Sequence, residues 1–193
     1  MNRTFRDSYD KKLVDFHWAN LPLDGEGTLT YQDGSEYSGS FKKGSYNGSG
    51  KFIWPDGTHY DGQWADDLPH ELGSMHLPSD EYKYSGEWRN GTPDGEGVEL
   101  LSDGSRYTGQ WKNGMKDGRG EMVFAGGKKY IGEWQNGMQH GKGVLFFPDA
   151  SRYEGTWEEN KICGEGTLIF WDGKKYRGDW DGDKFNGHFV TED

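Results

Sequence analysis

The chain has 193 residues, with 32 glycines, 9 Trp, 11 Tyr and 10 Phe, but only 31% hydrophobic residues in all. Aliphatic side chains are therefore scarce, and so much glycine weakens helices, which argues against a conventional α/β enzyme. The abundant rings argue against disorder, and a G-X-Y period is absent. The net charge of −11 disfavours binding to nucleic acid or anionic lipid, because both are negatively charged. An ordered, β-rich chain remains.

The cysteine content and the hydropathy of the sequence indicate the cellular compartment. The single cysteine, Cys163, cannot form an internal disulfide, which fits a reducing environment. The first ten residues are polar and charged, unlike a secretory signal, and no apolar run approaches the roughly 18 residues that span a bilayer. We therefore expect a cytoplasmic chain.

A 23-residue repeat sets the expected elements. The pattern Tyr-x-Gly-x-aromatic occurs at Tyr37-Gly39-Phe41, Tyr60-Gly62-Trp64, Tyr84-Gly86-Trp88, Tyr107-Gly109-Trp111, Tyr130-Gly132-Trp134, Tyr153-Gly155-Trp157 and Tyr176-Gly178-Trp180. A Gly-x-Gly motif keeps the same period. Such a period predicts one supersecondary unit per copy, stacked on its neighbours.

The chain begins with an extension, residues 1–13, whose structure the sequence leaves open. Residues 14–23 fit a half repeat, because Trp18 lies 23 residues before Phe41. A helix is the alternative for this stretch, since Phe5, Tyr9 and Phe16 share one helical face. We favour the half repeat, which would cover the first edge of the sheet.

Each full copy reads as a β-hairpin. In the first, residues 27–31 and 36–41 alternate on either side of Asp33-Gly34, a pair that favours a tight turn because glycine adopts positive φ easily. Tyr, Gly and Trp of the motif fall on one face of the sheet. We interpret the glycines as bare backbone on which rings lie flat, so that one sheet builds its own thin core.

Two stretches depart from the pattern. The third copy, near residues 71–88, is degenerate, because Glu71 replaces the first glycine of Gly-x-Gly. At the C-terminal end Phe189 replaces a glycine, as expected of a terminal half repeat that seals the array. The array is thus predicted to span residues 14–190, followed by a tail at 191–193.

The motif resembles the MORN (membrane occupation and recognition nexus) repeat family, most cleanly at residues 107–127. The resemblance implies an all-β fold: an elongated, single-layer antiparallel sheet of about seven stacked β-hairpins, with half-repeat caps at both ends and about fifteen strands. It also implies a groove, and members often dimerise. Phe41, Phe16 and Phe189 depart from the family pattern.

The sequence offers no pattern of catalytic, cofactor or metal-binding residues, and we predict no enzyme activity, cofactor or metal. The six histidines fall at scattered phases of the repeat. The run Asp179-x-Asp181-x-Asp183 imitates a calcium loop, but Lys184 and Val190 stand where that loop needs glycine and glutamate. Whether the degenerate third copy is a site or a tolerated loop stays open.

Two surfaces are candidates for protein partners. The ring-bearing face should form a groove that could hold an amphipathic helix, lined by Tyr107, Trp111, Tyr130, Trp134, Tyr153, Trp157, Phe124 and Phe147. The opposite face carries an apolar stripe in the C-terminal half, formed by Leu100, Val123, Phe146 and Ile169. The stripe is either a docking or homodimer surface or ordinary β-propensity on a wet face.

Lipid contact is a weaker alternative. The candidate residues are Lys128, Lys129, Lys174 and Lys175, which acidic residues outnumber.

Taken together, the sequence predicts a non-catalytic structural or adaptor protein that binds protein partners. Family resemblance suggests a cytoskeletal, ciliary or flagellar (radial-spoke-like, axonemal) assembly. The alternatives are a phospholipid-binding membrane–cytoskeleton tether and, least favoured, the regulatory fragment of an enzyme.

Overall fold

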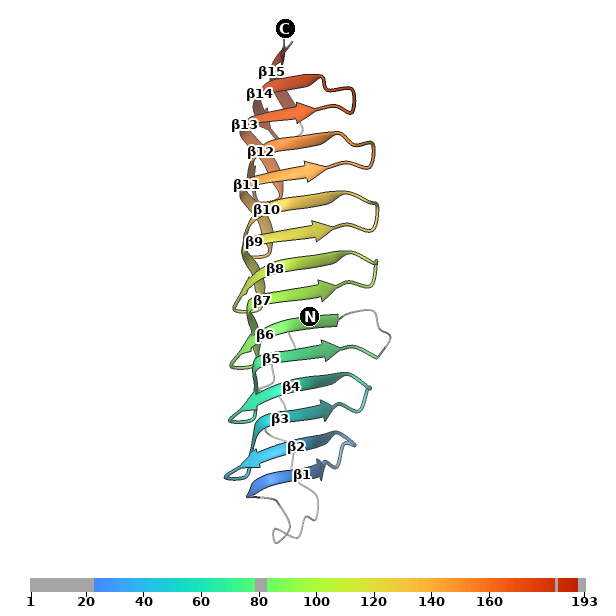
Figure 1. The fold of residues 1–193 in the computed structure, drawn as a ribbon, viewed down its shortest axis with the longest axis vertical. Coiled ribbons are helices and arrows are strands. Elements are labelled where there is room, and N and C mark those ends of the chain that lie inside the picture. The colour runs from blue at the N-terminus through green and yellow to red at the C-terminus, as the bar shows by residue number, and fades with distance from the viewer. Residues whose placement is uncertain (1–22, 79–82, 183, 191–193) are drawn as a thin grey trace. The chain divides into compact units, whose positions relative to one another are not determined.

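A computed structural model describes residues 23–78, 83–182 and 184–190 of the protein. Every regular element in these ranges is a β-strand. Fifteen strands form one antiparallel sheet in which each strand pairs with the strands before and after it in the chain. Figure 1 shows the successive hairpins side by side. The predicted all-β, single-sheet hairpin fold is confirmed.

The strands divide between two compact units, one ending at Glu99 and the other beginning at Leu100. Their bounds are β1 (Asp24–Thr30), β2 (Glu36–Lys42), β3 (Ser45–Ile53), β4 (His59–Ala65), β5 (Leu68–His76), β6 (Lys83–Arg89), β7 (Thr92–Leu100), β8 (Arg106–Lys112), β9 (Met115–Val123), β10 (Lys129–Gln135), β11 (Met138–Phe146), β12 (Arg152–Glu158), β13 (Lys161–Ile169), β14 (Lys175–Asp181) and β15 (Lys184–Val190).

The Asp-Gly turns form as predicted, with a contribution from the aspartate that the sequence analysis did not identify. Gly34 has φ +86°, and its N–H donates to the carbonyl of Tyr31. The carboxylate of Asp33 accepts the N–H of Ser35 at 3.0 Å. Asp56, Asp103, Asp149 and Asp172 bond their turns in the same way. The aspartate thus holds the turn that the glycine makes possible.

A second set of turns joins each hairpin to the next. At Asn113 and Gly114 the φ angles are +49° and +80°, which is the two-residue turn whose twist matches the strands that it connects. Asn136 and Gly137 repeat this geometry. The chain therefore alternates two turn types, one at each end of its strands.

The Gly-x-Gly glycines have two different roles. Gly120 lies opposite Gly109, and the register between β8 and β9 then shifts before Trp111 pairs with Lys116. Gly118, the first glycine of the motif, has φ +99°, so it supplies a bulge conformation and not a bare surface for a ring. Our interpretation of both glycines as ring supports was therefore wrong for the first glycine and is confirmed for the second below.

The predicted half repeat at 14–23 falls almost entirely outside the described residues, as do the extension 1–13, the tail 191–193 and the turn of the third copy. At the other end, β15 pairs with β14 alone among the described strands, and Gly187 lies opposite Gly178. Gly187 thus holds the place of the second glycine of Gly-x-Gly, and the prediction that Phe189 replaces a glycine was wrong, because Phe189 lies opposite Tyr176 as Leu168 does.

Replacing Gly132 with valine should destabilise the protein by about 3 kcal/mol, at the upper end for overpacked cores. A Cβ at Gly132 would lie 2.4 Å from Tyr130 Oη and 2.6 Å from the Cα of Gly143. Gly126→Ala is the control, because a Cβ there meets nothing within 4 Å. Urea unfolding followed by circular dichroism measures both variants, and equal midpoints for the two would contradict this account.

Candidate functional site

The tyrosine rings rest on the glycines of the neighbouring strand. A Cβ on Gly120 would lie 2.3 Å from Tyr107 Oη, and one on Gly143 would lie 2.4 Å from Tyr130 Oη. No side chain fits at that distance, so only glycine leaves room for the ring. The predicted packing of rings on bare backbone is confirmed.

Tryptophans pack edge-on against the sides of most of the tyrosines. The Tyr130 ring meets Trp134 of its own strand at 5.3 Å and 87°, and Trp157 of the next hairpin at 5.1 Å and 78°. Tyr60 meets Trp64 and Trp88 in the same way. Edge-to-face pairs of this kind add about 0.5–1.5 kcal/mol each to simple burial. Adjacent hairpins are therefore joined by rings as well as by backbone.

Several of the ring polar atoms are hydrogen-bonded to the backbone, whereas Tyr153 Oη is buried without a hydrogen-bond partner among the described residues. Tyr130 Oη donates to the carbonyl of Glu133 at 3.0 Å, and Tyr60 and Tyr84 make the equivalent bond. Trp64 Nε1 donates to the carbonyl of Gly50 at 2.8 Å. Burial raises the pKa of Tyr130 and Tyr60, and it raises the pKa of Tyr153 to about 12. The rings are thus neutral at physiological pH.

This packing buries most of the residues that were predicted to line the groove. Tyr107, Tyr130 and Tyr153 are 0–1% exposed, and Trp111, Trp134 and Trp157 are 4–6% exposed. Side chains of the paired strand cover them from the open side: Lys116 Nζ lies 5.2 Å from the centroid of the Tyr107 ring, and Gln139 is buried beside Trp134. Six of the eight residues that we assigned to partner binding therefore form the core, while Phe124 and Phe147 keep part of their surface.

The opposite face of residues 100–190 alternates apolar and basic side chains. Val123 lies opposite Arg106 and Lys129, Phe146 opposite Lys129 and Arg152, and Ile169 opposite Arg152 and Lys175. Leu100 holds the equivalent position on β7. We call this set the back band: Leu100, Arg106, Val123, Lys129, Phe146, Arg152, Ile169 and Lys175. The sequence predicts its apolar members and the polar columns beside them, and the register adds that basic side chains separate the apolar ones.

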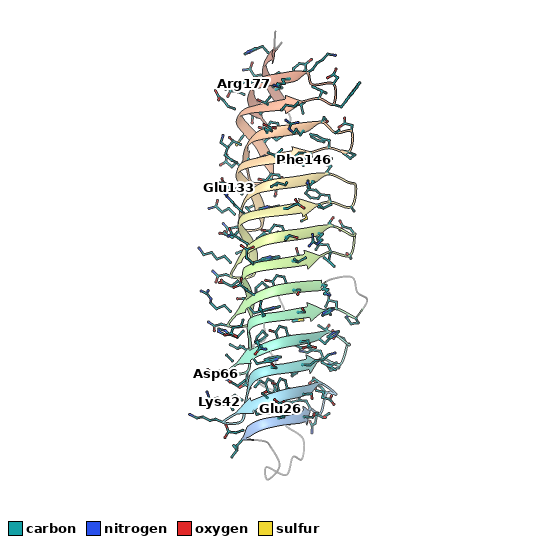
Figure 2. All side chains as sticks on the ribbon, viewed as in Figure 1. Glu26, Lys42, Asp66, Glu133, Phe146 and Arg177 are labelled. Atoms are coloured by element: carbon teal, nitrogen blue, oxygen red, sulfur yellow. The ribbon has the colours of Figure 1, made fainter. Side chains whose placement is uncertain are left out.

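Exposure and charge vary along the back band. Leu100 is 39% exposed and Ile169 is 9% exposed. Lys129 Nζ lies 5.1 Å from the centroid of the Phe146 ring and 3.7 Å from Glu121. Ile131, 40% exposed, widens the apolar surface and was missed, although six other copies carry a polar residue there. Figure 2 labels Phe146 among the side chains of this region.

The same face of the unit ending at Glu99 is more polar, although Ile53 and the 65% exposed Leu72 also lie on it. Thr28 Oγ1 donates to Ser38 Oγ at 3.2 Å, and Ser74 Oγ donates to Ser85 Oγ at 2.9 Å. The equivalent pairs in the second unit are Glu121 with Ile131, Val144 with Glu154 and Thr167 with Arg177. The positions of the apolar back-band residues hold Thr30, Ile53 and His76 in the first unit, so the unbroken apolar row is confined to residues 100–190.

Comparison with known families gives a match along nearly the whole chain. The MORN repeat profile matches residues 22–36, 37–59, 60–81, 84–106, 107–129, 130–152, 153–175 and 176–188. The chain belongs to the MORN repeat family. The hairpin packing described above is therefore the form that MORN repeats take in this protein.

Two solved structures are similar to this chain. The TCP domain of SAS-4 (dCPAP) from Drosophila melanogaster, in complex with a proline-rich motif of Ana2 (dSTIL), is 13% identical over 81% of this chain and 86% of that chain, with a TM-score of 0.51. The TCP10 domain of Danio rerio CPAP, in complex with a peptide of STIL, is 14% identical over 94% and 96% of the two chains, with a TM-score of 0.41. At this identity the SAS-4 match shows a shared fold.

The four lysines proposed for lipid contact do not form one cluster in this MORN array. Lys129 and Lys175 belong to the back band. Lys128 Nζ lies 5.7 Å from the centroid of the Phe147 ring, which the alternation of the strand places on the ring-bearing face. Lys174 Nζ is paired with Asp172 at 2.7 Å. Only two of the four could contact a common surface on the back face.

The described ranges contain no group of three or more His, Cys, Asp or Glu side chains that could hold a metal ion. His59 and His76 pair across β4 and β5, with their rings stacked at 4.7 Å and 4°. Burial raises the pKa of the Cys163 thiol, and Glu158 adds to this shift, which opposes thiolate chemistry. In the same ranges no helix has the length and apolar character to cross a bilayer.

The buried tyrosines predict alkaline unfolding. A tyrosine in the unfolded chain ionises near pH 10, and burial raises the pKa in the fold, so the unfolded state loses its protons first as the pH rises. Stability is thus complete below pH 10 and falls by about 1.4 kcal/mol per pH unit for each such tyrosine above it. Tyrosinate absorbance at 295 nm should rise together with loss of the β-sheet circular dichroism signal. Ionisation near pH 10 with the sheet intact would contradict this.

Proposed function

We propose that this MORN protein is a non-catalytic scaffold that binds protein partners, and that the back band is one of its binding surfaces. One observation carries the proposal: the ring-bearing face is largely buried within its own sheet, whereas on the opposite face Leu100 of the back band and the nearby Ile131 are about 40% exposed. A row of exposed apolar side chains on a rigid sheet is typical of an interaction surface. The partner is a second copy of the chain or another protein with a matching apolar surface.

Two further facts support a scaffold. The SAS-4 TCP domain, which shares the fold, carries a proline-rich motif of another protein. The backbone bonds and ring contacts repeat from hairpin to hairpin, so partner-binding side chains stand at fixed spacings. We further propose a cytoskeletal setting, such as a cilium or flagellum, for which family resemblance is the support.

Changing Leu100, Val123 and Phe146 together to threonine should abolish partner binding through the back band while leaving the sheet folded. Threonine favours strands, and these side chains lie outside the ring core. Light scattering after gel filtration measures self-association, and capture on the immobilised protein detects other partners.

Ile53→Thr is the matched control, because Ile53 occupies the equivalent place on β3 in the first unit. We expect this control to behave as wild type in both assays. The assignment of the back band fails if the triple variant keeps both its assembly state and its partners.

The alternative is a phospholipid tether, and the alternation of cations with apolar residues in the back band favours it. Against it, Lys129 and Arg152 are paired with Glu121 and Glu154, and the chain carries a net charge of −11. We therefore expect the protein to stay in the supernatant when vesicles with about one-third phosphatidylserine are sedimented at physiological salt. Sedimentation that Lys129→Glu with Lys175→Glu abolishes, and Lys128→Glu with Lys174→Glu does not, would establish the tether instead.

A further inference from the structure

A second row of apolar side chains lies on the ring-bearing face of the second unit, where the strands enter their Asp-Gly turns. Its members occupy one position of the repeat and are each partly exposed: Leu101, Phe124, Phe147 and Phe170. We call this row the turn ladder. Trp171 follows its last member and is 73% exposed. These side chains differ from the buried tyrosines and tryptophans of the same face, because a partner can reach them.

The turn ladder is held rigidly. The N–H of each member donates to the carbonyl four residues later, across the turn, at 2.9 Å. Phe170 also packs edge-on against Tyr176, with ring centroids 5.5 Å apart. The four side chains therefore stand at one equivalent place on every second strand.

The spacing of the turn ladder selects the conformation of its ligand. Neighbouring strands lie about 4.8 Å apart, so members of the ladder recur about every 9.6 Å. A polyproline II helix advances about 3.1 Å per residue with three residues per turn, and so presents one edge every 9.3 Å or so. Over the three steps of the ladder the two periods differ by only about 1 Å. Ten residues therefore span four members.

Other conformations fit less well. An α-helix repeats its apolar edge about every 10.5 Å, one heptad, and drifts from the ladder by about 3 Å over the same three steps. An extended strand turns its side chains to opposite faces at every residue, so positions three apart point in opposite directions. Aromatic rows are also the surfaces on which proline-rich segments bind.

Charge at the turn ladder favours a cationic segment. The carboxylates of Asp103 and Asp149 are exposed, and hydrogen bonds from Ser105 and Ser151 hold their pKa values below the usual range. Lys128 and Lys174 also lie near the row, but Lys174 is paired with Asp172 at 2.7 Å. With a net charge of −11 on the whole chain, arginine or lysine between the prolines would be attracted to this surface.

We propose that the turn ladder binds a proline-rich, basic segment of a partner protein in the polyproline II conformation, running across the strands with a proline or other apolar residue on each member. This rests on the proposed scaffold function and names a ligand class for it. The back band is on the other face of the sheet, so the two surfaces can be tested separately.

Fluorescence anisotropy with a labelled ten-residue peptide tests the proposal. The peptide has proline at positions 1, 4, 7 and 10, with one arginine and one serine in each gap. We expect saturable binding at physiological salt, and at least tenfold weaker binding of a peptide of the same composition whose prolines stand at every second position. Equal binding of the two peptides would show that charge alone attracts them and would overturn the proposal.

Variants on the two faces of one hairpin locate the site. Phe147→Ser should weaken binding at least tenfold, whereas Val144→Ser, on the opposite face of the same hairpin, should leave it unchanged. Trp171→Ala, at a side chain too exposed to support the fold, should weaken binding several-fold even if Phe147→Ser folds poorly. Unchanged binding by Trp171→Ala and by a folded Phe147→Ser would overturn the proposal.

The outcomes separate this proposal from the scaffold function. If the wild-type protein does not bind the peptide but the triple back-band variant still loses its partner or its self-association, only the turn-ladder proposal is refuted. Failure of both experiments removes the scaffold function as well.

Discussion

The contact between a tyrosine ring and a bare glycine backbone is the interaction on which this sheet depends. A sheet normally buries one face against a second layer, and the described residues provide no such layer. Here the ring of Tyr130 lies where a Cβ of Gly143 would stand, and Trp134 and Trp157 close its sides. The core is therefore about one side chain thick. Because the contact recurs from the Tyr37 copy to the Tyr153 copy, most hairpins depend on the next hairpin for part of their core, as expected of repeat proteins.

That core determines which surfaces remain for other molecules. The bulge at the first glycine of Gly-x-Gly bends the strand, and the residues between the inter-hairpin turn and this bulge, such as Lys116 and Gln139, lie against the rings. The ring-bearing face thus covers most of itself. Partners are left with its margin at the Asp-Gly turns and with the opposite face.

The fold could be predicted well from the sequence, because the 23-residue period determines where the strands and turns lie. Seven copies of Tyr-x-Gly-x-aromatic placed the strands and the Asp-Gly turns, and the scarcity of aliphatic residues implied a core of rings. Burial of the rings was harder to predict, because it depends on the bulge and on side chains from the paired strand. The first glycine of Gly-x-Gly was misassigned for a related reason: a glycine chosen for its φ angle and one chosen for the space it leaves look the same in a sequence.

The two units show how one repeat can carry different surfaces without changing its core. The tyrosine, the second glycine of Gly-x-Gly and the tryptophan are constrained by ring contacts, whereas the residues between them face solvent and tolerate change. In the first unit the positions of the apolar row hold Thr30, Ile53 and His76, and in the second they hold Leu100, Val123, Phe146 and Ile169 with their flanking cations. Ile131 is an example of such a variable position, because it lies between Tyr130 and Gly132 in the strand but takes no part in the ring core. Function in such a sheet resides in the positions that the period does not constrain, and these are the positions where the copies of this chain differ most.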